Sequence, residues 1–294
     1  MKISILPWMA AALMLLASCT SSDKGFRTES RTFDQSSDHA QLTLDATLPV
    51  ATTPGAAVMR QTLVDVMDQA LCRIDSEDGK RLFPRFEGDI NDSEALFSYY
   101  EQQGLAALEA KAKAFADMRA EGIRESTTLT DEEKDKYIAE TPGYGFGFHL
   151  DKVHETDKIA VFDSENYIYL GGAHGGITGE GPMTFDKQSG MRLRAFFEPG
   201  SEVPMQPLLR KGMLSYFQER MEAAGSTLEM HLHLRDDGLI PLPQWAPMPT
   251  ADGLKFIYQQ YEVTAYVDGM PEFTLTYDEV APYLLPEAKA DLGL

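Results

Sequence analysis

The sequence predicts an α+β protein, in which an antiparallel sheet is packed with helices and the chain forms two α+β subdomains. Apolar residues recur at helical spacing over residues 63–71, 97–118 and 209–221. From residue 144 the apolar period changes to two, which is typical of strands with one buried face. Because strands are expected on both sides of the helix at 209–221, they favour a sheet covered by helix over separate helical and strand domains.

The expected elements follow one another in a simple order. A strand at 41–48 precedes the first two helices. The helix after Thr130 begins with a capping box formed with Glu133 and stops near Pro142. The predicted strands after this helix cover residues 144–150, 158–162, 167–170 and 183–185. Beyond the helix at 209–221, further strands are expected at 254–258, 261–266 and 272–276, and Asp278 is a candidate cap of a last short helix.

The N-terminus is typical of a bacterial lipoprotein. Lys2 precedes an apolar run that ends at Leu16 and is too short to span a bilayer comfortably. The residues Leu16-Ala17-Ser18-Cys19 match the lipobox, in which the cysteine is lipidated before cleavage. We expect residues 1–18 to be a signal peptide, Cys19 to carry the lipid, and residues 19–38 to form a flexible tether. A plain secretory signal and an N-terminal membrane anchor are the alternatives.

Net charge and cysteine content limit the expected partners and the expected chemistry. The formal net charge is −20, and it becomes −21 without residues 1–18, which contain Lys2 and no acidic residue. This charge disfavours nucleic acid and anionic lipid surfaces, and favours cationic proteins or metal ions. Lipidation of Cys19 leaves Cys72 as the second of two cysteines, so no internal disulfide is expected. Cys72 lies in a helical pattern, which favours a buried and unreactive thiol over a nucleophile.

Two motifs in the second half resemble a known family. They are Tyr169-Leu170-Gly171-Gly172-Ala173-His174-Gly175, followed by Thr184–Gly190, and Asp252–Val263, followed by Tyr277–Leu284. Together they are similar to the RsiV-like C-terminal domain, known from a lysozyme-sensing anti-sigma factor. Residues 40–125 resemble more weakly the PdaC-like domain that precedes it in such proteins. The resemblance implies a PdaC-like domain at 39–141, an RsiV-like domain at 142–294, and an extracytoplasmic binding function.

His174, between Gly172 and Gly175, is the first candidate binding residue. A catalytic or ligating histidine needs a second ligand or a carboxylate nearby. The surrounding glycines favour a structural role, in which the ring bonds to backbone and locks a tight hairpin. Trp245, in a proline-rich loop, is either a binding finger for sugar or protein or a plug at the edge of the core.

Metal and carboxylate sites are the remaining alternatives. On a strand, His231 and His233 would share a face, and with His174 they would supply three zinc ligands. A solvated strand face is the simpler interpretation. Asp163 and Asp186 could form a carboxylate pair, although Asp186 is better explained by a bond within its own turn. No Walker loop, G-x-S-x-G elbow, H-E-x-x-H motif or dinucleotide fingerprint occurs.

These observations favour a non-catalytic, lipid-anchored binding protein of the bacterial cell envelope, with no cofactor. Its expected partners are the membrane, through the lipid, and either a cationic lysozyme-type protein or peptidoglycan. The alternative is a metal-assisted hydrolase or deacetylase that acts on envelope polysaccharide through His174, His231 and His233.

Overall fold

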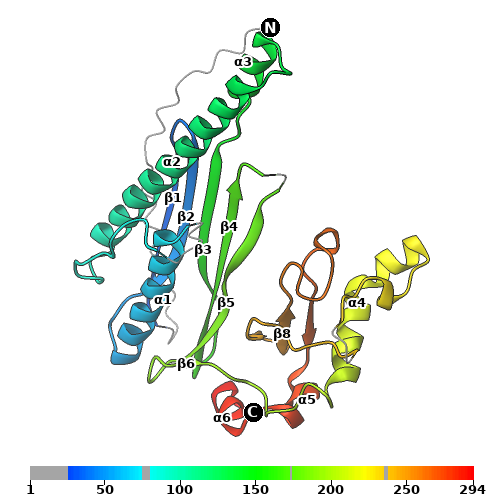
Figure 1. Ribbon diagram of the computed structural model, residues 1–294. Helices are drawn as coiled ribbons and strands as arrows, with labels where there is room; N and C mark the ends of the chain where they lie inside the picture. The colour runs from blue at the N-terminus through cyan, green and yellow to red at the C-terminus, as the bar shows by residue number, and fades with distance from the viewer. Residues whose placement is uncertain (1–25, 75–79, 173, 235–237) are drawn as a thin grey trace.

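The protein is described by a computed structural model that covers residues 26–74, 80–172, 174–234 and 238–294. In these residues, helices cover one face of a six-stranded sheet, and a second part combines a three-stranded sheet with a long helix (Figure 1). The predicted α+β class is confirmed. Cys19 and the lipobox lie outside the described residues. No helix in the described ranges is both long and apolar enough to cross a membrane.

The six-stranded sheet has the order β1-β2-β3-β4-β5-β6. Its strands are β1 (Thr28–Ser36), β2 (Ala40–Pro49), β3 (Tyr144–Glu155), β4 (Ile159–Leu170), β5 (Gly176–Asp186) and β6 (Arg192–Leu193). Neighbouring strands are antiparallel except β2 and β3, which are parallel. A parallel pair needs a long crossover, and here the crossover contains α1 (Pro54–Cys72), α2 (Ser93–Glu125) and α3 (Asp131–Ala139).

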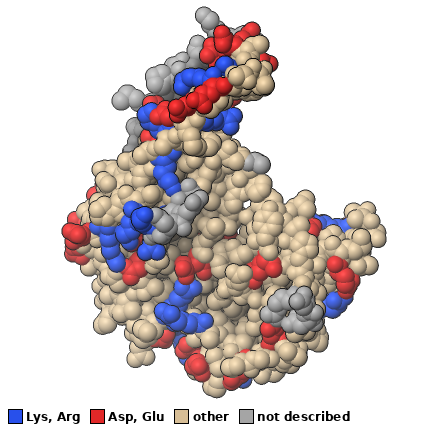
Figure 2. All heavy atoms as spheres, in the orientation of Figure 1, with Lys and Arg blue, Asp and Glu red and all other residues tan. Residues whose placement is uncertain are grey.

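Helices α1 and α2 pack on one face of this sheet because every second residue of β2 and β3 is apolar. Leu42, Leu44, Phe148 and Leu150 are fully buried in the core that they form with the two helices. The predicted capping box of α3 is present, with Thr130 and Glu133 bonded to each other's backbone N–H. Helix α2 continues past the end of the sheet, and together with α3 it forms an arm (Figure 1). Charged side chains of both signs gather along this arm (Figure 2).

The flexible tether expected at residues 19–38 is wrong for residues 28–36, because these residues form strand β1. Residues 28–36 pair with residues 41–49 of β2. The strand could not be predicted from an alternation of apolar residues, because Phe33 is its single large apolar residue. Ion pairs take the place of apolar contacts: Arg31 bonds to Glu101 of α2 at 2.9 Å, and Glu29 accepts a bond of 2.6 Å from the buried Arg60.

The second part has its own core. It contains α4 (Gln206–Ala224) and a sheet of β7 (Met248–Pro249), β8 (Leu254–Ile257) and β9 (Glu272–Leu275). The shorter elements are the 3-10 turns η1 (Leu228–Met230), η2 (Tyr266–Asp268) and η3 (Ala281–Tyr283), and the helices α5 (Tyr277–Val280) and α6 (Pro286–Leu292). The strand expected at 261–266 is instead a loop with one isolated bridge, and Thr276 rather than Asp278 caps α5.

The expected domain boundary after residue 141 is also wrong, because it does not separate the two hydrophobic cores. The first core extends from Ala40 to Phe185, and the second contains residues from Phe196 onward. A division after residue 141 would separate β2 from β3 and split one sheet. The physical boundary lies instead in the short connection that follows β6.

Candidate functional site

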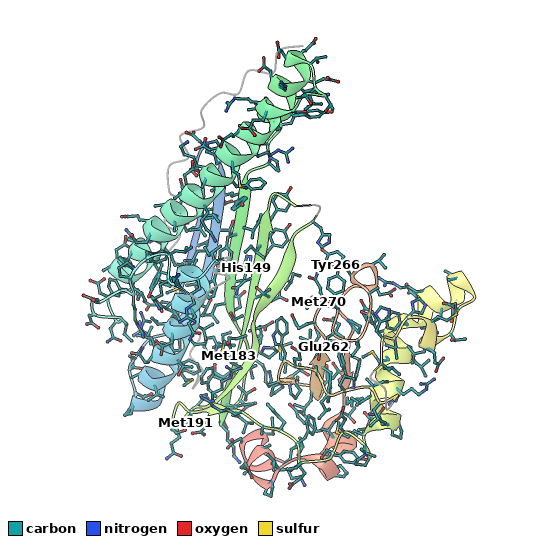
Figure 3. The ribbon with its side chains drawn as sticks, in the orientation of Figure 1. His149, Met183, Met191, Glu262, Tyr266 and Met270 are labelled. Carbon is teal, nitrogen blue, oxygen red and sulfur yellow. The ribbon has the colours of Figure 1, made fainter. Side chains whose placement is uncertain are left out.

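The face of the six-stranded sheet opposite α1 and α2, here called the open face, carries mostly polar side chains. Side chains alternate between the two faces of a strand, so the partners of the buried apolar residues point to this side. Strand register sets the outward side chains in rows. Thr32, Asp45, His149 and Glu165 form one row across β1 to β4. Figure 3 shows His149 in the middle of the sheet.

Five carboxylates occupy the open face on four adjacent strands. They are Asp34, Asp45, Asp151, Asp163 and Glu165. Asp34, Asp45 and Asp151 accept hydrogen bonds from uncharged side chains only: Gln41 and Thr43, Thr32, and Thr47, respectively. Within the described ranges none of the five forms an ion pair. Among the described residues the open face therefore carries negative charge that is not paired directly with a basic side chain.

Asp163 differs from the other four because the second part covers it in part. Burial, followed by the neighbouring charges of Glu165 and Asp151, raises its pKa to about 6, although Lys255 of β8 acts in the opposite direction. Its Oδ1 atom is buried without a hydrogen-bond partner. Asp163 is also directly opposite Asp151 across β3 and β4, a like-charge arrangement that costs free energy. The carboxyl group at this point takes up a proton close to neutral pH.

Three aromatic rings, here called the ring cluster, border the open face where the second part meets the β4–β5 hairpin. The His174 ring stacks on Tyr266 with centroids 4.2 Å apart, and Tyr266 lies 5.7 Å from Tyr261. Tyr266 lies on the side of the second part nearest to β5 (Figure 3). Tyr261 is 64% exposed and has a positive φ of 65°, the one such non-glycine residue among those described. The turn is held by Glu262, whose carboxylate accepts bonds of 2.7 Å from the backbone N–H groups of Gln244 and Gln259.

His174 and its glycines show the expected local geometry. The His174 Nδ1 atom lies 2.9 Å from the carbonyl oxygen of Gly175, which also accepts a 3.1 Å bond from the Tyr266 hydroxyl. A side chain at Gly175 would overlap the Tyr167 ring, so this close approach requires glycine. Gly172 has no such restriction, because a methyl group there would meet only the His174 carbonyl at 4.0 Å. The exposed His174 ring joins the hairpin to the second part.

Trp245 lies in the contact between the two parts and is 8% exposed. Its Nε1 atom donates a 3.2 Å bond to the Gly179 carbonyl, and its ring packs against Gly181. Gly181 has a φ of +64°, and a side chain there would overlap the indole. This burial favours the plug over the binding finger.

The three histidines proposed as zinc ligands do not converge. The strand expected at His231 and His233 is a turn after η1, and the two rings do not share a strand face. His231 is bonded to Ser226 and Asp268, while His174 stacks on Tyr266. Among the described residues no group of three or more His, Cys, Asp or Glu side chains could hold a metal ion. Asp186 is bonded to Ser189 within its own turn, as predicted.

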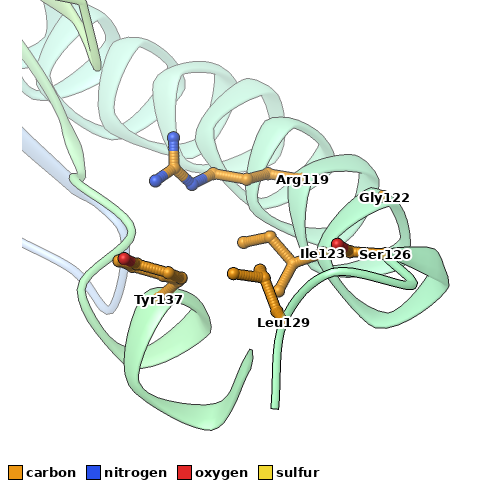
Figure 4. A pocket seen from close by; sticks show the side chains of 6 residues that line it. All are labelled: Arg119, Gly122, Ile123, Ser126, Leu129 and Tyr137. Atoms are coloured by element: carbon orange, nitrogen blue, oxygen red, sulfur yellow. The ribbon is translucent and has the colours of Figure 1, made fainter. Parts of the chain in front are cut away.

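An open pocket of about 520 Å³ lies between the end of α2 and α3 (Figure 4). Its lining residues are Arg119, Gly122, Ile123, Ser126, Leu129 and Tyr137. The sequence did not suggest this pocket, because its two sides come from separate helices. It is remote from both the open face and the ring cluster.

The fold and these surfaces define an α+β protein with two cores, in which a long sheet leaves one face open beside a smaller helix-and-sheet unit. Residues 196–278, which lie in the second core, match the model of the family described as "Protein of unknown function (DUF3298)". This part of the chain is therefore a DUF3298 domain. The match covers less than half of the chain, and it does not establish the RsiV-like or PdaC-like resemblance.

Two solved structures have a similar fold. A member of the DUF3298 family from Bacteroides fragilis is 16% identical, with a TM-score of 0.62 over 90% of this chain and 96% of that chain. A DUF3298 family protein from Pseudomonas aeruginosa is 13% identical, with a TM-score of 0.50 over 92% and 98% of the two chains. At such identities the similarity shows the fold alone. No curated protein matches the sequence.

Proposed function

We propose that the protein is a lipid-anchored binding protein of the bacterial cell envelope, and that its open face docks a cationic protein of the lysozyme type. The observation that supports this best is the set of five carboxylates on four adjacent strands, none of which forms an ion pair with another described residue. Unneutralised charge of one sign raises the association rate of an oppositely charged partner.

The dimensions of the open face suit a protein partner. At roughly 4.8 Å between strands and 3.4 Å per residue, the four strands β1 to β4 present a face about 15 Å wide and about 30 to 40 Å long, which the second part covers in part at Asp163. Because each partner buries roughly 800 Å² in a specific complex, a docked protein would also contact the ring cluster. The ring cluster beside it supplies aromatic anchors, the residue type that most often dominates binding energy.

Calorimetric titration of the full chain with a c-type lysozyme over a salt series tests the proposal. A chain of charge −20 attracts any cationic protein at low salt, so the decisive affinity is the one near 150 mM salt. We expect saturable 1:1 binding that survives there. The open-face variant, with Asp34, Asp45 and Asp151 changed to Asn, should bind at least tenfold more weakly.

A matched control separates docking from net charge. Asp131, Glu132 and Asp135 are exposed acids of α3, and changing them to Asn, Gln and Asn removes the same charge from the arm. This variant should bind like the unaltered chain at 150 mM salt. Binding that disappears with salt, or that falls equally in both variants, would contradict docking at the open face.

Cell-wall glycan is the second candidate ligand, and the exposed ring cluster favours it because sugar rings stack on aromatic faces. Titration with soluble peptidoglycan fragments distinguishes it from the first. Binding that is insensitive to salt, lost in Tyr261→Ala and retained in the open-face variant would assign the ring cluster to glycan.

The anchor is tested separately. We expect Cys19→Ala to abolish labelling by radioactive palmitate and to release the chain from the membrane fraction. Labelling that persists in Cys19→Ala would contradict the lipobox assignment, whatever the result of the binding experiments.

A further inference from the structure

Ser226, His231 and Asp268 form a hydrogen-bonded series in the second part, away from the open face. The Ser226 hydroxyl lies 2.8 Å from Nε2 of His231, and Nδ1 of the same ring lies 3.3 Å from Oδ1 of Asp268. This is the order of a catalytic triad: the serine is in contact with a base, and the base is in contact with a carboxylate that orients it. From this geometry we propose that Ser226 is a nucleophile, activated by His231, that accepts the acyl group of small neutral esters.

Separate elements hold the three side chains. Ser226 follows Gly225, the left-handed residue that ends α4, while His231 follows η1 and Asp268 ends η2. The His231 ring stacks on Phe217 with centroids 4.9 Å apart, which fixes its plane. The His231 and Asp268 side chains are each 16% exposed, so the pair is shielded while a ligand can still reach Ser226, which is half-buried.

Asp268 is suited to orient the ring and not to react. It also receives a 3.2 Å bond from Arg220, and its backbone carbonyl is bonded by Tyr216 and Arg220. When Nδ1–H of His231 donates to Asp268, Nε2 becomes the acceptor for the Ser226 proton. Asp268 is therefore a positioning residue.

The backbone beside Ser226 supplies a donor for the developing oxyanion. The amide that follows a nucleophilic serine is a common oxyanion donor. Here it belongs to Thr227, whose N–H donates to no acceptor within the described part of the chain. Gly225 has no atom within 4 Å of the place where a side chain would be, which leaves room for a small acyl group.

The reaction balances without a cofactor. Ser226 Oγ bonds to the ester carbon while its proton passes to His231 Nε2, and the alcohol then leaves with that proton as the C–O bond breaks. In the second half, water loses a proton to His231 as its oxygen bonds to the acyl carbon. The carboxylic acid leaves, and Ser226 recovers the proton.

A neutral fluorophosphonate probe applied to the full chain, followed by peptide mass mapping, tests the proposal. We expect the phosphonate on Ser226 and none on Ser189, an exposed serine that is bonded to Asp186 without a histidine. His231→Phe keeps a ring to stack on Phe217 but removes both nitrogens, and it should slow labelling at least 100-fold. Hydrolysis of p-nitrophenyl acetate should fall in parallel.

Asp268→Asn tests positioning through the pH profile. The labelling rates of the unaltered chain and of Asp268→Asn should follow different pH profiles, because the variant lacks the carboxylate that holds the His231 ring. Thermal unfolding of each variant confirms that it is folded. A folded chain whose Ser226 stays unlabelled, or is labelled at the same rate in His231→Phe, would overturn the proposal and leave the series as a structural tie of α4 to η2.

Discussion

At the scale of single residues, Asp163 couples stability to pH. Its folded pKa of about 6 lies above 3.8, the ordinary value of an aspartic acid, so the folded state binds a proton more readily than the unfolded state. The free energy of unfolding should therefore fall as pH rises from about 4 to about 7, and should change little from this source above that range.

Asp163→Asn should remove this dependence and raise the free energy of unfolding at pH 7.5 by at most about 3 kcal/mol. Urea unfolding between pH 4 and 8 measures it. Asp34→Asn is the control, since Asp34 is exposed and bonded to Gln41 and Thr43. An Asp163→Asn chain that keeps the slope of the unaltered chain would show that another group is responsible.

Arg60 is a buried cation on which several elements depend. Its side chain is 1% exposed, and it donates to Glu29, to the carbonyls of Pro49 and Ile90, and to Ser93. Arg60→Met should cost about 3–5 kcal/mol because it leaves these acceptors without a donor. Arg85→Met, which breaks the exposed pair with Asp65, should cost less than about 1 kcal/mol in the same urea experiment.

From the sequence, the hydrogen-bond partners of site residues could be predicted only where the partners are close in the chain. The bond from Asp186 to Ser189 and the contact of His174 with its neighbour's carbonyl were predictable for this reason. His231 and Asp268 lie 37 residues apart, so no local pattern could join them. The H-x-H spacing pointed instead to a strand and a metal, because the sequence does not reveal that η1 turns the chain there.

At the scale of elements, Gly181 and Gly122 form a matched pair for mutation, because one is tightly packed and the other is open. A side chain at Gly181 would overlap Trp245, and the φ of +64° there is unfavourable for alanine. Gly122 lies inside α2 with no atom within 4 Å of an added methyl group. Gly181→Ala should lower the melting temperature by several degrees, whereas Gly122→Ala should raise it slightly through better helix propensity. Equal effects would show that Trp245 does not pack as described.

Helices were predicted better than strands because their signals are local. The stripes of α1, α2 and α4 and the capping box of α3 depend on residues three or four apart. Strand β1 has no apolar pattern, and β4 was expected as two strands because its centre, Asp163 to Asn166, is polar. Asp163 and Glu165 are polar because they lie on the open face, whereas Ser164 and Asn166 lie on the helix-covered face, opposite Leu150 and Phe148 of β3. A bulge at this point displaces the register of β4 with β5.

At the scale of the whole molecule, unpaired negative charge should make the fold more stable in moderate salt. Between 10 and 150 mM salt the screening length falls from about 30 to about 8 Å, which weakens repulsion across the open face. We expect the melting temperature to rise over this range. The open-face variant should melt higher at low salt and respond less to added salt than the α3 control. A melting temperature that falls with salt would show that ion pairs dominate instead.

The division of the chain follows the cores and not the resemblance. The expected division after residue 141 depended on sequence motifs, whereas the DUF3298 match, residues 196–278, lies within the second core. The fold class could be predicted because it follows from the order of periods along the chain. The pairing of β2 with β3 could not, since it joins segments separated by three helices.

That parallel pair has a consequence for the order of folding. The β1–β2 hairpin can form early, but the other edge of β2 has no partner until all of α1, α2, α3 and the start of β3 have been synthesised. Pairing over such a sequence distance costs loop-closure entropy before it gains contacts, and it slows folding. In the interval the hairpin presents a free edge and an apolar face to other chains. Helices α1 and α2, which form from local signals, can cover that apolar face first and protect the nascent sheet from aggregation while β3 is still to come.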